Sequence, residues 1–207
     1  MKEAVILAGG KGLRLKPLTE TIPKSLVMIK NKPLIDYQLD WLEKNGYTRI
    51  IVACGYKYDV LKKYLGNSVE YSVESAPLGT AGAVNKAKKL LQSKDFLVIN
   101  GDIITDLNLE EFEKIHERLS IVVTPLKCPF GVISEDGGKV VFHEKPKLPY
   151  WINAGIYLMN KSVKLPAKGD LERDVFPNEQ LKIFKYEGFW KSIDTFKDVA
   201  EVEKELE

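Results

Sequence analysis

Short apolar runs without polar alternation recur along this 207-residue chain and are separated by segments of helical spacing. Such strands are covered on both faces, because a strand with one wet face would alternate apolar and polar residues. Right-handed helical crossovers between them build a parallel sheet. The chain is therefore predicted to be α/β, with a doubly wound, mostly parallel, Rossmann-like sheet. The expected strands are Ala4–Ala8, Arg49–Ala53, Phe96–Asn100 and Ile121–Thr124, and the expected helices are Leu34–Lys44, Asp59–Leu65, Ala81–Leu91 and Leu109–Leu119.

The pattern changes after Pro125. Gly131–Glu135 and Val140–Glu144 flank an Asp-Gly-Gly turn and predict a hairpin, and Trp151–Asn160 predicts a longer strand. These segments are expected as antiparallel additions on one side of the sheet. A final helix is expected over Thr195–Leu206, with Thr195 as N-cap and an aspartate three residues later in a capping-box position.

Composition limits the class of partner. The chain has 31 basic and 29 acidic residues and 44% apolar residues, enough for one core, so a single domain over 1–207 is expected. The chain has no block of basic residues that could bind along nucleic acid or a membrane surface, which favours a small-molecule partner. Cys54 and Cys128 lack the spacing of a zinc site or a disulfide framework. The first residues are too short an apolar run for a secretion signal, so a cytoplasmic protein is expected.

The first strand leads into a glycine-rich loop. Gly9, Gly10 and Gly12 let the backbone approach an anion closely, and Arg14 and Lys24 can add full charges to the N–H dipoles of the loop. The spacing matches neither G-x-G-x-x-G nor the Walker loop. A polyphosphate site of another kind is indicated.

A Gly101-Asp102 pair follows the strand that ends at Asn100. Alone, such a pair is most often a turn. Ligands of an open parallel sheet bind beyond the carboxyl ends of its strands, however, and the glycine loop is expected at the same edge. A carboxylate beside bound phosphates would hold Mg²⁺, which prefers one or two carboxylates together with phosphate oxygens.

Several further motifs occur in order along the chain. They are AVILAGGKGLRLKPLT, PKSL, PLGTAGAV, INGD, FGVI, EKP, NAGIYLMN and FWKSIDT. With these motifs the chain resembles the sugar-1-phosphate nucleotidylyltransferases over nearly its whole length, and among them the short, single-domain members similar to mannose-1-phosphate guanylyltransferases. The resemblance implies the nucleotide-diphospho-sugar transferase fold and transfer of a nucleotidyl group to a sugar 1-phosphate, with pyrophosphate released.

The resemblance also implies a nucleotide site. Arg14 would grip the departing phosphates, Lys24 would neutralise charge near the α-phosphorus, and Asp102 would complete the catalytic set. The alternative for Arg14 and Lys24 is ordinary solvated surface. The implied nucleotide-binding residues are Leu7, Ala8, Gly9, Gly10, Gly12, Arg14, Lys24, Glu74, Pro77, Gly79 and Thr80.

A sugar site is implied by the later motifs. Glu144 would accept sugar hydroxyls and Lys145 would bind the sugar phosphate, whereas their alternative is a surface ion pair. Asn153 is assigned to the sugar as well, against a polar residue satisfied at a strand edge. Gly101 and Gly155 complete the implied substrate-binding set.

The second metal ligand departs from the family pattern. Many members carry W-x-D-I-G, whereas FWKSIDT has Ser192 at that aspartate and Asp194 two residues later. In an extended stretch these two side chains share a face, so Asp194 could join Asp102 as a ligand of Mg²⁺. The alternative is that Asp194 caps the final helix. Leu13, where many members have Thr or Ser, and Ser25, where the family usually has a second proline, are further departures.

Glu74 bears on the choice of base. A carboxylate can accept two parallel hydrogen bonds from guanine, whereas the carbonyls of uracil or thymine would be repelled. The alternative is that Glu74 is simply exposed at a strand end. GTP is favoured, and the resemblance to guanylyltransferases implies mannose 1-phosphate, or a heptose 1-phosphate, as the acceptor. Two alternatives stay open: a UTP- or dTTP-dependent glucose-1-phosphate enzyme, and a catalytically silent relative that binds nucleotide sugars. Homo-oligomerisation also stays open.

Overall fold

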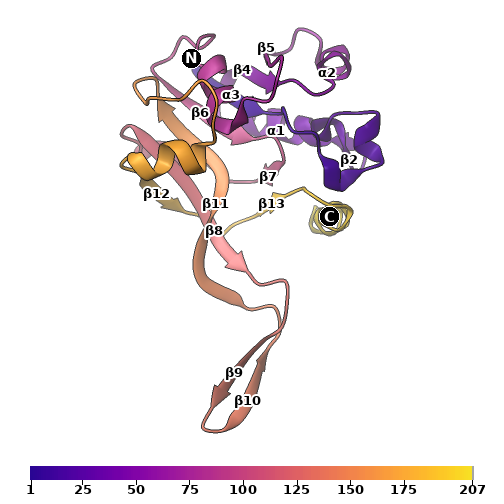
Figure 1. The fold of residues 1–207 in the computed structure, drawn as a ribbon, viewed down its shortest axis with the longest axis vertical. Helices are drawn as coiled ribbons and strands as arrows, with labels where there is room; N and C mark the ends of the chain where they lie inside the picture. Colours follow the sequence, from indigo (N-terminus) through magenta and orange to yellow (C-terminus); the bar gives the residue numbers. More distant parts are fainter. Residues whose placement is uncertain (207) are drawn as a thin grey trace.

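A seven-stranded sheet in the order β12-β8-β11-β6-β1-β4-β5 forms the centre of the computed structural model, which describes residues 1–206 (Figure 1). Neighbouring strands are parallel except at β11, which runs antiparallel to both β6 and β8. The α/β class and the mostly parallel sheet are thereby confirmed. The strands are β1 Lys2–Leu7, β4 Tyr47–Cys54, β5 Glu70–Val73, β6 Asp95–Asn100, β8 Leu119–Lys127, β11 Lys147–Asn160 and β12 Lys182–Lys185.

Helices cover both faces of this sheet, as its unbroken apolar strands require. On one face, α1 Leu34–Lys44, α2 Tyr58–Leu65 and α4 Leu109–Lys114 pack on the sheet through residues such as Trp41, Leu61 and Phe112. The other face is covered by α3 Gly79–Ala87 and a π-helical turn, Leu171–Val175. Strand β1 therefore buries successive side chains in two different cores, with Val5 toward α3 and Ile6 toward α1.

The helix expected over Leu109–Leu119 is wrong in its second half. Helix α4 ends at Lys114, and Leu119 already belongs to β8, where it pairs with Met159 of β11. The backbone N–H of His116 turns back onto the carbonyl of Glu113, and the helix stops there. Sheet pairing at this point overrides a local spacing that suits a helix. Helix α3 likewise begins at Gly79, two residues before the expected start, and ends at Ala87 instead of Leu91.

The long antiparallel strand is not an addition at one side of the sheet, as expected, but lies inside it. β11 is bonded to β6 on one edge and to β8 on the other, and its residues 154–160 are buried. An interior position explains why this half of the strand is apolar on both faces.

The expected hairpin is present and projects from the body as a narrow arm (Figure 1). Its strands, β9 Val132–Asp136 and β10 Lys139–His143, pair only with each other and turn through Gly137 and Gly138, both with positive φ. Such a pair of residues matches the two-residue turn that suits the twist of a hairpin. β11 continues from the base of this arm into the sheet.

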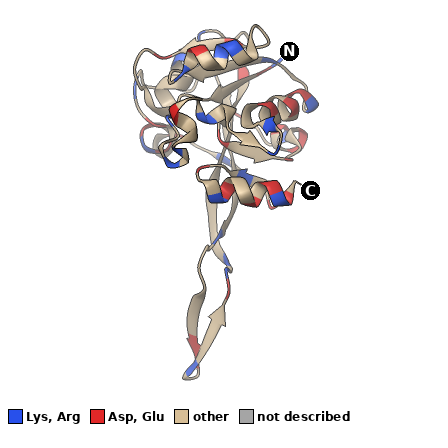
Figure 2. Ribbon diagram, turned by 90° about the vertical axis from the view of Figure 1, so that its right-hand side faces the viewer, with Lys and Arg blue, Asp and Glu red and all other residues tan. Residues whose placement is uncertain are grey.

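Small additions surround the sheet. β2 Met28–Ile29 pairs with β3 Lys32–Pro33, and β13 Trp190–Ser192 pairs with β7 Ile103–Thr105. The last helix, α5 Phe196–Glu205, begins at Thr195 with the expected capping box to Asp198. Both acidic and basic residues occur along α5, which ends beside the carboxyl terminus (Figure 2). Among residues 1–206, no helix has the length and apolar character needed to cross a membrane.

Candidate active site

A cavity of about 660 Å³ opens at the carboxyl ends of β1, β4 and β6, on the face covered by α3. This is the edge where open parallel sheets bind ligands, and the volume suits a nucleotide. Every residue predicted to bind nucleotide lines this cavity, as do Gly101, Asp102 and Asp194. The structure thus brings together side chains from both ends of the chain.

The glycine loop follows β1 and forms one wall. Gly12 has φ +59°, and its carbonyl accepts hydrogen bonds from the Thr19 hydroxyl at 2.8 Å and the Leu15 N–H at 2.9 Å. A Cβ at this position would lie 2.9 Å from a Thr19 methyl carbon and 3.1 Å from Cβ of Lys24. The loop therefore needs glycine here both for its backbone conformation and for space.

The end of β6 closes against the end of β1. Gly101 donates its N–H to the carbonyl of Leu7 at 3.0 Å, and a Cβ on Gly101 would lie 2.5 Å from that carbonyl oxygen. The missing side chain lets the two strand ends meet. Asp102, the next residue, is thereby fixed beside the glycine loop.

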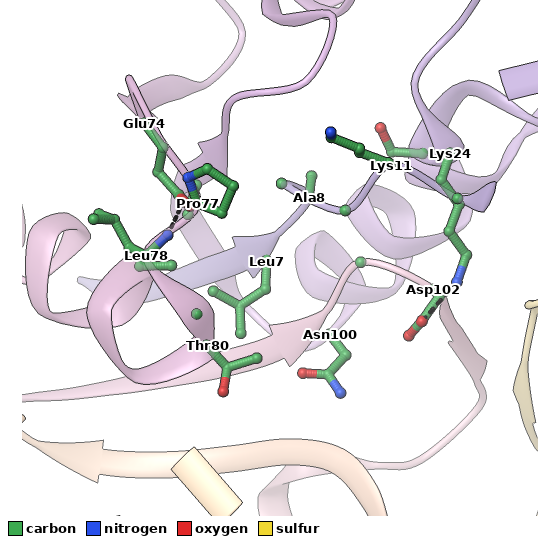
Figure 3. Close-up of a pocket in the computed structure, with 18 of the residues that line it drawn as sticks. Leu7, Ala8, Lys11, Lys24, Glu74, Pro77, Leu78, Thr80, Asn100 and Asp102 are labelled. Carbon is green, nitrogen blue, oxygen red and sulfur yellow. Dashed lines mark hydrogen bonds and ion pairs between the residues drawn. The ribbon is translucent and has the colours of Figure 1, made fainter. Parts of the chain in front are cut away.

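Lys24 lies between two carboxylates at this edge. Its Nζ is 2.7 Å from Oδ2 of Asp102 and 2.7 Å from Oδ1 of Asp194, and Arg14 reaches the same Asp194 oxygen at 2.8 Å. Figure 3 shows the contact with Asp102. Lys24 is 13% exposed, whereas Arg14 is 68% exposed. Lys24 is thus held in place by the cluster, and Arg14 extends from it into solvent.

Asp194 points its carboxylate into this cluster and not onto the final helix. Burial alone would raise the pKa of Asp194, but the hydrogen bond and charge of Lys24, with the charge of Arg14, hold it below its usual value. The Ser192 hydroxyl donates to the other oxygen at 3.3 Å, and the backbone of Ile193 is tied to Asp102. The helix is capped instead by the box of Thr195 and Asp198, in which the Asp198 carboxylate accepts the Asp194 N–H at 2.9 Å and the Thr195 N–H at 2.7 Å.

The loop from Glu74 to Thr80 forms the opposite wall and enters α3 (Figure 3). Glu74 accepts the N–H of Leu78 at 3.1 Å, which orients the carboxylate across the loop. Burial raises the pKa of Glu74, partly offset by that N–H and by the charge of Lys86. A partly buried carboxylate fixed in this way can read a pair of N–H donors.

The residues predicted to bind the sugar are not gathered in the same way. Glu144 and Lys145 lie at the base of the arm, 3.8 Å apart and both more than half exposed, and they do not line the cavity. Asn153 and Gly155 lie on β11 beside the cavity without lining it. The Asn153 amide hydrogen-bonds the Tyr157 hydroxyl at 2.7 Å and Glu172 at 3.1 Å.

Some cavity residues were missed by sequence reasoning. Asn100 is the residue before the Gly-Asp pair and shares the cavity face with Leu7, so strand alternation could have identified it. Lys11 and Ser25 stand inside motifs already recognised. Asp170 comes from a stretch with neither strand nor helix periodicity, and only the fold places it there.

The chain is similar to known proteins over most of its length. A sequence model described as nucleotidyl transferase matches residues 3–193. A mannose-1-phosphate guanyltransferase of Aspergillus oryzae is 39% identical over 95% of this chain and 62% of its own length. One from Xenopus laevis, named beta-A, is 36% identical with the same coverage. The chain thus spans 62% of the length of these curated relatives.

Solved structures show the same fold. HddC from Yersinia pseudotuberculosis, complexed with GMP-PN, superposes with a TM-score of 0.82 and 29% identity over 100% of both chains. A putative glucose-1-phosphate thymidylyltransferase from Bacillus anthracis, in complex with a sucrose, has a TM-score of 0.75 and 25% identity over 99% of this chain and 94% of its own. With a family model that matches residues 3–193, this chain belongs to the nucleotidyl transferase family.

Proposed function

We propose that this protein transfers a nucleotidyl group from a nucleoside triphosphate to a sugar 1-phosphate. The observation that carries the proposal is the meeting of Lys24, Arg14, Asp102 and Asp194 beside the glycine loop, within one nucleotide-sized cavity. Cations and N–H groups then face the place where a triphosphate would lie. The family match and the names of the curated relatives support the same reaction.

In this reaction a phosphate oxygen of the sugar 1-phosphate attacks the α-phosphorus in line. A new P–O bond forms, the bond from the α-phosphorus to the bridging oxygen breaks, and pyrophosphate leaves with the electron pair. Charge spreads over phosphoryl oxygens in the transition state, so positioned cations and N–H dipoles do most of the catalysis. Lys24 is assigned to the α-phosphoryl oxygens, Arg14 to the departing phosphates, and the Gly9–Gly12 backbone to orienting the triphosphate.

Asp102 and Asp194 have the chemistry of a divalent cation site. Their oxygens approach one ammonium from two sides at 2.7 Å each, so a single cation can bridge them. Two carboxylates that leave room for phosphate oxygens suit Mg²⁺. When bound there, Mg²⁺ would supply charge neutralisation on the phosphate oxygens.

The favoured pair of substrates is GTP with mannose 1-phosphate. Glu74 is oriented by the Leu78 N–H and can accept both N1–H and the amino group of guanine. The names of curated relatives, mannose-1-phosphate guanyltransferase, and the GMP-PN complex of HddC point to the same base. UTP or dTTP with glucose 1-phosphate is the alternative pair, and the thymidylyltransferase neighbour is its support.

A second candidate is a catalytically silent relative that binds a nucleotide sugar. The exposed position of Glu144 and Lys145 favours it, because two residues expected at the sugar lie on the arm and outside the cavity. Retention of all four charged residues at the glycine loop favours the enzyme.

Pyrophosphate release tests these readings directly. The purified chain is incubated with GTP, UTP, dTTP, CTP or ATP, each with mannose, glucose or heptose 1-phosphate, and with Mg²⁺ or EDTA. The expected result is Mg²⁺-dependent release that is fastest with GTP and mannose 1-phosphate. Release only with UTP or dTTP would reject the assignment of Glu74. Binding of GDP-mannose without any release from any pair would leave the silent relative as the function.

A further inference from the structure

The Glu172 carboxylate forms the centre of a polar network just beyond the cavity. One of its oxygens, Oε1, accepts hydrogen bonds from the Asn153 amide at 3.1 Å and from the Tyr157 hydroxyl at 3.2 Å. The Asn153 amide also donates to the Tyr157 oxygen at 2.7 Å. Three side chains thus orient one another, with Glu172 on the π-helical turn and the other two on β11.

Tyr157 makes this network rigid. Its side chain is fully buried in the core under α3 and packs against Phe176, with ring centroids 5.2 Å apart. Burial, followed by the charge of Glu172, raises the pKa of Tyr157 well above its usual value. The phenol therefore keeps its proton and donates a hydrogen bond to Glu172. A carboxylate fixed by a buried tyrosine loses little further entropy when it binds a ligand.

The network is continuous with the nucleotide cavity through Thr80. This residue lines the cavity, accepts the Leu171 N–H at 2.8 Å and lies 3.4 Å from the second oxygen of Glu172. The carbonyl of Gly169 accepts the N–H of Ala81 at 2.9 Å, which ties the turn to the start of α3. Glu172 is consequently held between the nucleotide loop and β11.

Beside this network, β11 passes close to the end of β6. Gly155 carries no side chain where β11 passes Asn100, and a Cβ there would lie 2.7 Å from the Asn100 amide nitrogen. Asn153 uses its oxygen to accept the Gly155 N–H at 2.8 Å, which fixes the backbone at this point. Glu172 is exposed, and the one hydrogen bond that its second oxygen accepts, from the Thr80 hydroxyl, is long at 3.4 Å, so this oxygen can accept a further hydrogen bond from a ligand.

We propose that Glu172 accepts hydrogen bonds from the ring hydroxyls of the sugar and so helps to select the sugar. The proposal rests on the proposed function, which supplies the sugar 1-phosphate. A carboxylate is an acceptor only, so it favours neutral sugars that offer hydroxyl donors and repels a sugar that carries its own carboxylate. Asn153 and Tyr157 are positioning residues for this carboxylate. Thr80 lines the nucleotide cavity and also contacts Glu172, so it fixes the carboxylate relative to the nucleotide.

Glu172→Gln tests the assignment because it keeps the size of the side chain and removes its charge. Glu179→Gln is the matched control: Glu179 is paired with Arg118 away from the cavity. Calorimetry measures the affinity of each variant for GDP and GDP-mannose, and for UDP and UDP-glucose. Glu172→Gln should weaken the binding of the nucleotide sugar by tenfold or more, as for a hydrogen bond to a charged group, with the nucleoside diphosphate unchanged. The control should behave as wild type.

Kinetics supply a second readout. Glu172→Gln should raise KM for the sugar 1-phosphate on the order of tenfold and leave KM for the nucleoside triphosphate within about twofold. With the wild-type protein, a deoxy sugar 1-phosphate that lacks the bound hydroxyl should show the same rise in KM as Glu172→Gln shows with the normal sugar. With Glu172→Gln, removing this hydroxyl should raise KM no further. Thermal midpoints of both variants are measured beside these values.

The outcomes separate this inference from the proposed function. Equal loss of nucleotide and nucleotide-sugar binding would make Glu172 a structural residue and overturn the inference. So would wild-type affinity of Glu172→Gln for the nucleotide sugars, or a wild type that binds them no more tightly than the diphosphates. Absence of pyrophosphate release from wild type, with the expected binding losses intact, would overturn the proposed function alone.

Discussion

The Nζ of Lys24 lies 2.7 Å from Oδ1 of Asp194, across 170 residues of sequence. The same ammonium lies 2.7 Å from Asp102, so one side-chain cation bridges the two carboxylates assigned to Mg²⁺. A metal ion and this ammonium compete for the same oxygens. A nucleotide that draws Lys24 toward its phosphates would free the carboxylate oxygens of Asp102 and Asp194 for the metal ion. The triphosphate and the metal are therefore predicted to bind cooperatively.

Lys24→Gln should therefore bind a divalent cation more tightly than wild type when no nucleotide is present. Removing the ammonium leaves the two carboxylates without the positive charge that lies between them. The affinity for Mn²⁺ should therefore rise by roughly tenfold, whereas turnover should be lost. Electron paramagnetic resonance of free Mn²⁺ measures the affinity. Lys11→Gln removes another charge from the cavity wall and should leave it unchanged. Weaker Mn²⁺ binding by Lys24→Gln would refute the competition.

Asp102→Asn should abolish transfer without unfolding the protein. The amide keeps the shape of the side chain but loses the charge, and a loss of about 100-fold or more in kcat is expected. Lys24 retains Asp194 as a partner, so the thermal midpoint should move by no more than about 4 °C. Pyrophosphate release and calorimetric melting are measured on the same preparation. A large drop in midpoint with activity retained would make Asp102 a structural turn residue.

Asp194→Ala and Asp198→Ala should separate the metal site from the helix cap. Asp194→Ala should raise the Mg²⁺ concentration needed for half-maximal rate, because one of the two assigned carboxylates is gone. Asp198→Ala removes the capping box and should cost about 1 kcal/mol of unfolding free energy with Mg²⁺ dependence unchanged. Mg²⁺ titrations and thermal melts of both variants make the comparison. Unchanged Mg²⁺ dependence in Asp194→Ala would contradict its role as ligand.

Glu74 should impose an acid limb on guanine binding. Reading guanine requires the ionised carboxylate, and burial raises the pKa of Glu74. As the pH is lowered, GDP affinity should therefore begin to fall at a pH above the ordinary titration range of a glutamate. UDP affinity should not fall there. Asp194 does not titrate in that range, since Lys24 holds its pKa below the usual value despite burial. Glu74→Gln should weaken GDP binding and remove the acid limb.

The raised pKa of Glu74 also determines how this residue changes the stability of the fold with pH. A carboxyl group whose pKa is raised by folding favours the folded state when protonated, and this contribution is lost as the pH rises through the raised pKa. Glu74→Gln should therefore melt at a higher temperature than wild type at neutral pH, and the difference should shrink on acidification. An identical melting profile at every pH would contradict the burial of this charge.

The gathering of the residues assigned to the nucleotide around one cavity could be predicted from sequence because these residues are local to strand ends. Gly9–Gly12 and Asp102 each follow a buried strand directly, and parallel strands end at one edge. Asp194 could be predicted only in part: its distance from Ser192 suggested the site, but its contact with Lys24 depends on how β13 packs against β7.

The placement of the residues assigned to the sugar could not be predicted in this way. Glu172 stands in a π-helical turn with no periodic signal, and its partners on β11 are set by tertiary packing. The motif containing Glu144 and Lys145 was recognised, but where the arm carries these residues is decided by strand pairing and not by the motif. The end of α4 at Lys114 was missed for a related reason, since pairing of Leu119 with β11 overrides local spacing.

β11 has a mechanical consequence. β11 runs from Lys147, at the base of the arm, to Asn160 in the centre of the sheet (Figure 1). Its pairing with β8 shifts register between Asn153 and Tyr157, where Gly155 has φ +70°. Its inner half is clamped by β6 and β8, whereas its outer end leads to a hairpin that pairs with nothing but itself. The strand is thus fixed only at its inner end, and the irregular stretch beside Asn153 is where a displacement of the arm would be absorbed.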